Sequence, residues 1–416
     1  MPVTITLPRG TRPVRIAVMA LALVGGFFTI RSGAAFFLAT PATAEIALQI
    51  DPTNGDAMST RADEWLKTVQ MGDEAAKLSA FSRQALEQSP YNVIALRDIG
   101  IITAANDDEP GAERLLSLAS RLSLRDYLTH AWLLDYRFRT GQVAASVREA
   151  DIVLRQMPEN WEIIMPALVA LTNDPRVIDP LARALAAKPD WRGTFLYKLS
   201  EANPNPPETF ALLQRLKALG SAASKEELDQ YFVVAGQKTP VRTLYAQWVA
   251  LLPSSAKGES AALLHDPDFA GLDAPPPFGW RLYPSEGVYA ERGPGPGGMG
   301  SALFASFAGD KETVFANQEL VLYPGHYRLS GRAFADDAID KGTFRWSVIC
   351  MTKEHQAQLG QAPITTIPGK LVSYAIEFDV PADCDQQGIA LVGAAVGDSF
   401  DTPGLYVDGL QLKRLR

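Results

Sequence analysis

The side chains that could support catalysis lie mainly in the last third of the chain. Hydrolysis of a glycosidic bond needs two carboxyl groups roughly 5 to 10 Å apart. Five glutamates are available in that third: Glu286, Glu291, Glu319, Glu354 and Glu377. Glu377 projects from the polar side of an alternating segment, but no spacing gives it a partner. The sequence also has no nucleophile elbow and no defensible pairing of a histidine with a serine. We therefore expect no enzymatic activity.

The sequence has only two cysteines, Cys350 and Cys384. In an oxidising compartment such a pair predicts one disulfide, which stabilises a fold by about 2 to 4 kcal/mol. In the cytoplasm the same pair would be two unreactive core thiols. The four histidines are scattered without the spacing of a metal site: His130, His265, His326 and His355.

Length and charge bound the class of protein. A chain of 416 residues is long enough for two or three domains, and an apolar fraction of 47% is ordinary for a globular protein with one membrane segment. The net charge of −8 argues against binding to nucleic acid.

An apolar run near the N-terminus bears on where the rest of the chain lies. Residues 16–30 carry no charge and follow Arg9, Arg12 and Arg15, and no acidic residue precedes Glu45. A basic start followed by an apolar segment is typical of a membrane anchor and of a signal peptide.

The two interpretations place the boundary differently. In the first, residues 16–38 are a transmembrane anchor, residues 1–15 stay in the cytoplasm, and Arg31 reaches the lipid headgroups. In the second, a signal peptide is cleaved at the small residues that end at Ala44. We favour the anchor, because the distance to Ala44 is long for a signal peptide. Both interpretations put the later residues outside the cytoplasm.

Residues 45–270 show helical rather than strand periodicity. Apolar residues recur there at helical spacing, and each stripe predicts an amphipathic helix with one buried face. Three such stripes are Ala62-Trp65-Leu66-Val69, Leu115-Leu118-Ala119-Leu122 and Val143-Val147-Ala150-Leu154.

The helical segments repeat. Related stretches, each with a proline after a helix end, occupy residues 47–57, 85–96, 153–164 and 184–195. Pro90 and Pro158 are 68 residues apart, which is twice 34. Helix pairs with a period of 34 residues resemble the tetratricopeptide repeat, here over residues 45–200.

Single positions agree with this resemblance in part. Gly100, Ala112 and Ala119 fall where that family has small residues, whereas Arg137 takes the place of an aromatic residue. The resemblance implies a solenoid whose concave face docks a protein partner. A rigid spacer that holds the C-terminal domain away from the membrane is the alternative.

The composition changes at residues 273–280, where three consecutive prolines predict a domain boundary. We expect residues 271–277 to be a proline-rich linker and residues 278–416 to form a separate β domain. Alternating segments at 327–333, 344–350 and 372–380 predict half-buried antiparallel strands.

The last strand changes phase. Leu405 and Val407 alternate in one parity and Leu410 and Leu412 in the other, which predicts a β-bulge at Asp408-Gly409. Seven or eight strands in such a domain predict a β-sandwich or jelly roll. The fold class is therefore multidomain α plus β: an N-terminal membrane helix, a tetratricopeptide-like α-solenoid and a C-terminal antiparallel sandwich.

The β domain resembles a known family. Residues 318–335 (QELVLYPGHYRLSGRAFA), 374–391 and the closing 405–412 (LYVDGLQL) are similar to carbohydrate-binding modules of the galactose-binding-like jelly-roll type. The resemblance implies a sandwich that contacts polysaccharide. It also implies that Asp408 could help to hold a structural calcium ion, for which no other ligand can be assigned. No other cofactor is expected.

Sugar recognition needs an aromatic platform with polar groups around it. Trp280 and Tyr289 lie near the domain edge and are the favoured platform residues, with Tyr283 a further candidate. Trp346 shares its parity with apolar residues, and we expect it in the core. The arginines that could meet an acidic polysaccharide are Arg281, Arg328, Arg332 and Arg345. For each of these residues a solvated sheet face is the alternative.

Anchored repeat arms joined to sugar-module-like heads resemble accessory proteins of bacterial exopolysaccharide or capsule assembly and export. This resemblance implies a single-pass protein of the bacterial inner membrane, with its N-terminus in the cytoplasm and its bulk in the periplasm. The helical arm would dock a protein partner and the head would contact polysaccharide. A purely structural envelope scaffold that binds only proteins is the alternative.

Overall fold

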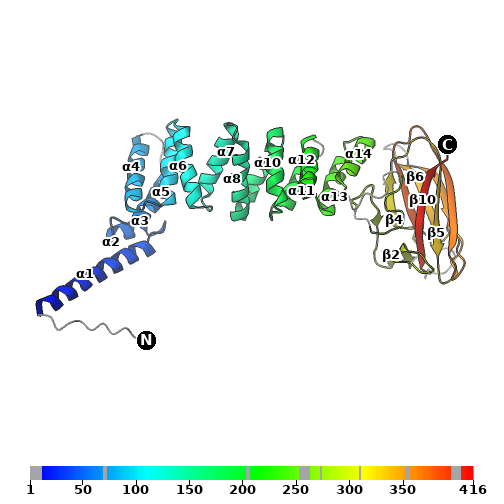
Figure 1. The fold of residues 1–416 in the computed structure, drawn as a ribbon, viewed down its shortest axis with the longest axis horizontal. Helices are drawn as coiled ribbons and strands as arrows, with labels where there is room; N and C mark the ends of the chain where they lie inside the picture. Colours follow the sequence, from blue (N-terminus) through cyan, green and yellow to red (C-terminus); the bar gives the residue numbers. More distant parts are fainter. Residues whose placement is uncertain are drawn as a thin grey trace. The chain divides into compact units, whose positions relative to one another are not determined.

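The computed structural model describes residues 12–68, 73–202, 207–252, 263–271, 274–308, 311–351, 356–394 and 404–415. The chain divides into two compact units, residues 1–164 and 165–416. The described residues form fourteen α-helices followed by ten β-strands (Figure 1). This confirms the predicted fold class of helices followed by an antiparallel sandwich, with ten strands where seven or eight were expected.

The first unit is helical. Its helices are α1 (Arg12–Phe37), α2 (Ala44–Ile50), α3 (Gly55–Leu66), α4 (Asp73–Gln88), α5 (Val93–Ala105), α6 (Glu109–Leu122), α7 (Tyr127–Arg139) and α8 (Val143–Gln156). A short 3₁₀ turn, Pro158–Asn160, leads into α9 (Trp161–Leu171), which crosses the division between the units. Consecutive helices pack in pairs: α3 with α4, α5 with α6, and α7 with α8.

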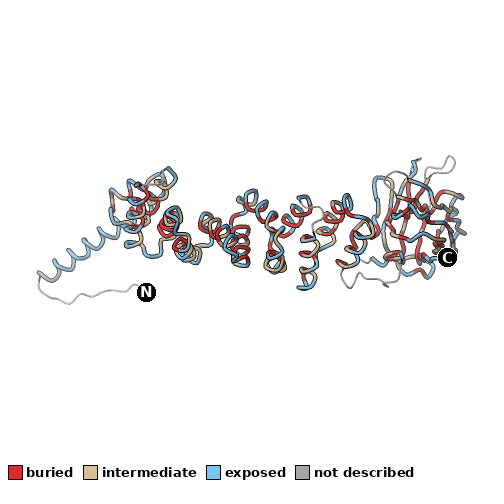
Figure 2. Tube along the Cα trace, turned by 90° about the horizontal axis from the view of Figure 1, so that it is seen from above, coloured by how far each residue is buried: buried red, intermediate tan, exposed pale blue. Residues whose placement is uncertain are grey.

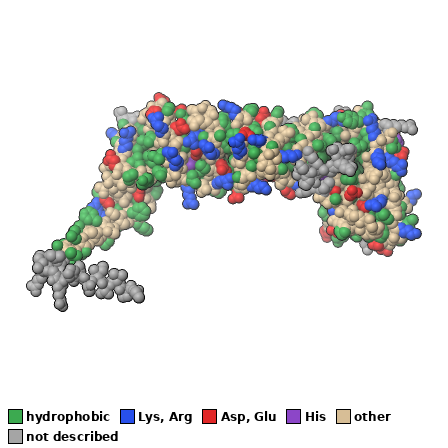
Figure 3. Space-filling model, viewed as in Figure 1, with side chains coloured by type: hydrophobic (Ala, Val, Ile, Leu, Met, Phe, Trp, Pro, Cys, Tyr) green, Lys and Arg blue, Asp and Glu red, His purple; other side chains and the backbone are tan. Residues whose placement is uncertain are grey.

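Helix α1 is apolar and exposed. Within it Ile16–Phe37 is 22 residues long, and none of its most apolar window is buried. Figure 2 shows its trace as exposed along most of its length, and Figure 3 shows hydrophobic side chains on its surface. At about 1.5 Å per residue this segment is roughly 33 Å long, which matches a hydrocarbon core of about 30 Å. By length and composition it could be a membrane span or a signal sequence.

The repeated segments mark the starts of successive helix pairs. Pro90 lies between α4 and α5, and Pro158 between α8 and α9, where the ring interrupts the helical hydrogen bonds. The helix that opens each pair has a side-chain cap at its start. Asn54, Asn92 and Asp126 each accept the backbone N–H three residues on, which satisfies one of the free donors of α3, α5 and α7.

Small residues allow the helices of one pair to approach. A Cβ on Gly100 of α5 would lie 2.7 Å from Leu116 Cγ of α6, which is too close for two carbon atoms. Ala112 and Ala119 of α6 are fully buried. The three small residues therefore lie in closely packed positions. Membership of the tetratricopeptide family stays a prediction.

The arginine in place of an aromatic residue has a polar role. Arg137 donates hydrogen bonds to Glu149 and to Ser117, which is 2.7 Å away. His130 is fully buried beside it, with Nδ1 2.5 Å from a carboxylate oxygen of Glu149. A buried ion-pair network thus fills the position where the repeat family places a ring.

The second unit joins five helices to the sandwich. The helices are α10 (Pro175–Ala186), α11 (Arg192–Ala202), α12 (Pro207–Ala218), α13 (Lys225–Ala235) and α14 (Val241–Leu251). Trp248 of α14 is buried and donates its indole N–H to Pro275 O at 2.8 Å. The ring of Phe278 packs on Trp248 with centroids 5.7 Å apart. Helix α14 is therefore fixed to the edge of the β domain.

The predicted linker, residues 271–277, is packed rather than free where the structure describes it. Pro275 O accepts from Trp248, and Pro277 O accepts from Glu319 N at 3.0 Å. Residues 272–273 lie outside the described part. Leu264 and Phe269, which we assigned to the helical domain, belong to the sandwich core. The expected boundary at residue 278 is therefore too late, because the core of the β domain recruits residues from position 264 onward.

The β domain is two five-stranded sheets. The strands are β1 (Arg281–Leu282), β2 (Val288–Pro294), β3 (Ser301–Phe307), β4 (Thr313–Leu320), β5 (Gly325–Phe334), β6 (Phe344–Met351), β7 (Gln356–Pro363), β8 (Val372–Val380), β9 (Gln387–Gly393) and β10 (Leu405–Arg414). Sheet A has the order β1-β4-β9-β6-β7, and sheet B has the order β2-β3-β10-β5-β8, with every described pair antiparallel.

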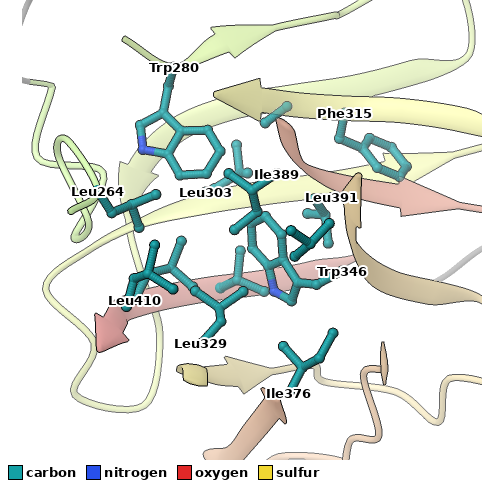
Figure 4. Packing of buried hydrophobic residues seen from close by; sticks show 14 of the residues in the cluster. Leu264, Trp280, Leu303, Phe315, Leu329, Trp346, Ile376, Ile389, Leu391 and Leu410 are labelled. Atoms are coloured by element: carbon teal, nitrogen blue, oxygen red, sulfur yellow. The ribbon is translucent and has the colours of Figure 1, made fainter. Parts of the chain in front are cut away.

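One apolar core lies between the two sheets. Trp346 of β6 is fully buried in it, as expected from its parity, and donates its indole N–H to Tyr374 Oη at 2.7 Å. Figure 4 shows Trp346 among Leu329, Ile389 and Leu391, with Trp280 close by. The predicted bulge is confirmed: the register of β10 against β5 shifts between Asp408 and Gln411, and Gly409 has φ +59°. The single glycine lets β10 change phase there.

Candidate functional site

Sheet B carries a group of aromatic side chains on the side that faces away from the core. Residues that lie directly opposite each other in an antiparallel sheet project to the same side. Phe304 of β3 is opposite Glu291 of β2 and Tyr406 of β10, and Tyr406 is in turn opposite Phe334 of β5. Their neighbours Leu303 and Val407 point into the core. We call this side of sheet B, with Tyr289, Phe304 and Tyr406, the aromatic face.

The rings of the aromatic face lie close together. The centroids of Phe304 and Tyr406 are 4.9 Å apart, and Phe334 meets Tyr406 edge-on at 6.5 Å. Phe304 and Tyr406 are half-buried and Phe334 is buried. Tyr289, two residues from Glu291 on the edge strand β2, is 62% exposed. The face therefore presents apolar ring surface to solvent beside charged groups.

The glycine-rich segment 293–300 is the turn from β2 to β3, as its composition indicates. Gly295 N donates to Gly300 O at 2.8 Å, and Gly297 and Gly298 both have positive φ. A Cβ on Gly297 would lie 3.1 Å from the Phe334 ring. Glycine at this position thus lets the turn lie against Phe334 and close one end of the aromatic face.

An ion pair borders the aromatic rings. Arg332 of β5 donates from Nε to Asp408 Oδ1 at 3.0 Å and from its terminal nitrogen to the other carboxylate oxygen. Asp408 is buried, while the Arg332 side chain is 42% exposed. Burial raises the pKa of Asp408, and the Arg332 guanidinium opposes that rise. The exposed edge of the guanidinium can still donate to a ligand oxygen.

The surroundings of Asp408 do not fit a calcium ion. Calcium takes about six to eight oxygen ligands, but both oxygens of this carboxylate already accept hydrogen bonds from Arg332. Within the described residues no three His, Cys, Asp or Glu side chains are grouped to hold a metal. The cation beside Asp408 is the arginine.

The predicted sugar-contact residues do not all lie on one face. Tyr289 and Arg332 belong to the aromatic face or its border, and Arg328 is exposed further along β5. Arg345 lies on β6 of the other sheet and pairs with Glu312. Tyr283, which follows β1, is also beside sheet A, where its hydroxyl donates to Asn317 at 3.2 Å.

Trp280 corrects the prediction of an aromatic platform. It is 4% exposed and donates its indole N–H to Asp266 O at 3.0 Å. Its ring packs on Phe269 and Trp346, with centroid distances of 5.0 and 6.0 Å. The expectation was wrong because the segment before β1, which carries Phe269, covers the indole.

Arg281 lies at a cavity that is separate from the aromatic face. It lines a cavity of about 660 Å³ in the second unit, together with Glu319 and with residues of α13, α14 and the 383–386 loop. Burial raises the pKa of Glu319, although a hydrogen bond from Gln386 opposes the rise. Arg281 is therefore separate from the aromatic face.

The described glutamates do not form a hydrolytic pair on sheet B. Glu291 is on β2 and Glu377 on β8, the two edge strands of that sheet. Four inter-strand spacings of about 4.8 Å separate them by roughly 19 Å, beyond the reach of paired carboxyl catalysis. Glu354 lies outside the described residues. The absence of enzymatic activity stays a prediction.

Phe304 and Tyr406 were missed by the reasoning from sequence. Each stands between two apolar core residues: Leu303 and Ala305 flank Phe304, and Leu405 and Val407 flank Tyr406. That pattern is a usable signal, since an aromatic residue with the outward parity of a strand is unusual on a solvated sheet.

Cys350 and Cys384 form a disulfide, with Cα atoms 5.8 Å apart. It connects β6 to the loop before β9 and so holds that loop against sheet A.

Two carboxylates, Asp379 and Glu377, lie beside His326 near the start of β5. Replacing His326 with glutamine should lower the thermal midpoint at about pH 5.5 and change it little at about pH 9. His326 Nδ1 lies 2.8 Å from Asp379 Oδ1, and Nε2 lies 3.2 Å from Glu377 Oε2. Hydrogen bonds to Asp379 and then to Glu377 raise the pKa of His326 from its ordinary value.

The sign follows from proton linkage. A raised folded-state pKa gives stabilisation that is complete below the unfolded-state pKa and is lost as the pH rises through the folded-state value. Thermal unfolding of the wild type and His326→Gln at both pH values measures it. As a control, a Glu377→Gln, Asp379→Asn variant should give His326 an ordinary titration by NMR. Equal losses at both pH values would contradict the ion-pair account.

No family model matches the chain, and no curated protein matches it. Solved structures of carbohydrate-binding modules are similar to its β domain. The xylan-binding CBM22-1 domain of Paenibacillus barcinonensis Xyn10C is 12% identical, with a TM-score of 0.27, over 33% of this chain and 86% of that one. A family 16 carbohydrate-binding module is 18% identical, with a TM-score of 0.26, over 36% and 99%. TmCBM61, solved with β-1,4-galactotriose, is 17% identical, with a TM-score of 0.26, over 37% and 98%.

Proposed function

We propose that the protein is a membrane-anchored accessory protein of bacterial exopolysaccharide or capsule assembly and export, and that the aromatic face of its β domain binds polysaccharide. Tyr289, Phe304 and Tyr406 carry the glycan part of the proposal: their rings stand on the solvent side of sheet B. The apolar side of a pyranose ring packs on such rings.

Polar groups at the border supply the second requirement. Sugar hydroxyls donate and accept hydrogen bonds, so a binding face needs both kinds of partner beside its rings. Glu291 offers acceptors next to Phe304, and Arg332 offers donors two strands away. Tyr289 on β2 and Tyr406 on β10 are two strands apart and offset by two residues along the strands, which makes roughly 12 Å and suits a polymer better than a single sugar.

The remaining parts of the proposal concern location and partners. Helix α1 would hold the protein in the inner membrane with its bulk in the periplasm, where Cys350 and Cys384 can pair. The paired helices α3–α8 would dock a protein of the assembly or export machinery. Exposed apolar side chains at the end of α6 and the start of α7 support a docking role for this region: Leu118, Leu122, Leu124 and Leu128.

Titration of the full-length protein with neutral and acidic polysaccharides tests the glycan part. A Tyr289→Ala, Tyr406→Ala variant should bind about a hundredfold more weakly, since each lost ring contact costs about 1.4 kcal/mol, or tenfold. Tyr283→Ala is the matched control, because Tyr283 is partly exposed beside sheet A. Its affinity should match that of the wild type. Affinity electrophoresis in polysaccharide gels gives the ratios.

The competing function is a structural scaffold that binds only proteins. In that case no polysaccharide retards the wild-type protein, and the double tyrosine variant supports normal polymer production in cells. Co-purification would still recover a membrane complex through the helical arm.

A further inference from the structure

The C-terminal end of α1 packs against other helices of the first unit and is hydrogen-bonded to them. Arg31 donates from Nε to Ile50 O and from a terminal nitrogen to Asp51 Oδ1, both at 2.8 Å. Ser32 donates to the other carboxylate oxygen of Asp51 at 3.3 Å. One turn on, Ala35 is fully buried against Ala47 and neighbouring residues. The last turns of α1 therefore share a core with α2 and α3.

The residues of the possible cleavage site are also folded. Thr43 donates to Leu38 O at 2.7 Å, and Ala44 is 2% exposed at the first position of α2. Cleavage at Ala44 would remove Arg31 and Ala35. It would leave the buried Asp51 without its arginine, and an unpaired buried charge is costly.

The depth of Arg31 locates this junction. Arg31 lies six residues, or about 9 Å along the helix, before Phe37, where the apolar segment ends, and its charge favours a depth near the lipid headgroups. Asp51 must lie at the same depth, since the two side chains are hydrogen-bonded. The pair keeps the charge compensated at the membrane boundary.

Apolar side chains are exposed around the junction. Phe36 is 67% exposed and Phe37 is 81% exposed at the end of α1, and Ile46 of α2 is 49% exposed. They continue the exposed apolar surface of α1 beyond Arg31.

We propose that α1 is retained in the mature protein and that residues 36–46, the turn into α2, lie in the interfacial layer of the bilayer, clamped to α1 by Arg31 and Asp51. The partner of this surface is the lipid bilayer itself, because the surface is continuous with the apolar helix. The inference rests on the proposed anchoring. It adds that the first unit sits directly on the membrane surface rather than on a flexible tether.

Depth-dependent fluorescence quenching tests the inference. The two native cysteines form a disulfide, so one added cysteine can be labelled in the full chain. Ile46→Cys tests the junction, Phe28→Cys reports the span, and Tyr91→Cys, at a site 82% exposed between α4 and α5, is the control. The labelled proteins are reconstituted in phosphatidylethanolamine–phosphatidylglycerol vesicles with bromine at shallow or deep acyl positions.

The expected result is quenching of Ile46→Cys by shallow bromines at least twofold above that of Tyr91→Cys, with Phe28→Cys quenched by deep bromines. An intact mass that includes residues 1–44 should accompany it. If Ile46→Cys resembles Tyr91→Cys while Phe28→Cys is quenched, the junction inference is overturned and the anchor stands. A mature N-terminus at Glu45 in cells would overturn both.

Discussion

Trp280→Ala should destabilise the β domain by about 3 to 5 kcal/mol, the range for removing a buried tryptophan. Trp280 is 4% exposed, and its ring contacts Phe269 and Trp346. The substitution also removes the hydrogen bond that the indole N–H donates to the backbone oxygen of Asp266. Urea unfolding of the full chain, followed by near-ultraviolet circular dichroism, measures the loss.

The effect of Trp280→Ala on stability should be compared with that of Tyr289→Ala. Tyr289 is 62% exposed, so its removal should change the free energy of unfolding by no more than about 0.5 kcal/mol. Its effect should fall on polysaccharide affinity. If Trp280→Ala kept full stability and lost ligand binding instead, the assignment of Trp280 to the core would be wrong.

Replacing Cys350 and Cys384 together with alanine should destabilise the β domain by nearly as much. The disulfide closes a loop with a sequence separation of 34. Loop closure in the unfolded chain then accounts for about 3.8 kcal/mol. The urea midpoint of the double variant should fall accordingly, and the slope of its urea dependence should rise, because the unfolded chain exposes more surface without the crosslink.

Reduction of the wild-type protein provides the matched control. A reducing agent should lower the wild-type midpoint to that of the double alanine variant and should leave the variant itself unchanged. If free thiols are detected after reduction but the wild-type urea midpoint does not change, the crosslink contributes nothing to the stability of the β domain. The result bears on location, because a stabilising disulfide suits a compartment outside the cytoplasm.

The helical part could be predicted well because its information is local. A helix is formed by residues three and four apart, so the stripe Leu115-Leu118-Ala119-Leu122 defines α6 without reference to any other segment. The prolines and the capping residues act within one turn. What Arg137 contacts was beyond local reasoning, since Glu149 belongs to the next helix.

In the β-sandwich, the sequence predicted which side of a strand each residue faces but not which strands are neighbours. Alternation correctly separated the two sides of β5, β6 and β8, and the phase change located the bulge at Asp408-Gly409. Alternation says which residues share a side of one strand. It does not say which strands are neighbours, because strand pairing joins residues far apart in the chain.

The candidate site shows which features came from local sequence patterns and which from strand pairing. The sequence alone determined that helices precede a β domain, that an apolar helix starts the described chain, and that Trp346 belongs to the core. Only the tertiary structure decided that β10 lies between β3 and β5, which puts Tyr406 beside Phe304 and Arg332 beside Asp408. It also decided that the segment around Phe269 covers Trp280. The physical reason is that burial and proximity arise from long-range packing, whereas periodicity records only the direction in which a side chain leaves its own backbone.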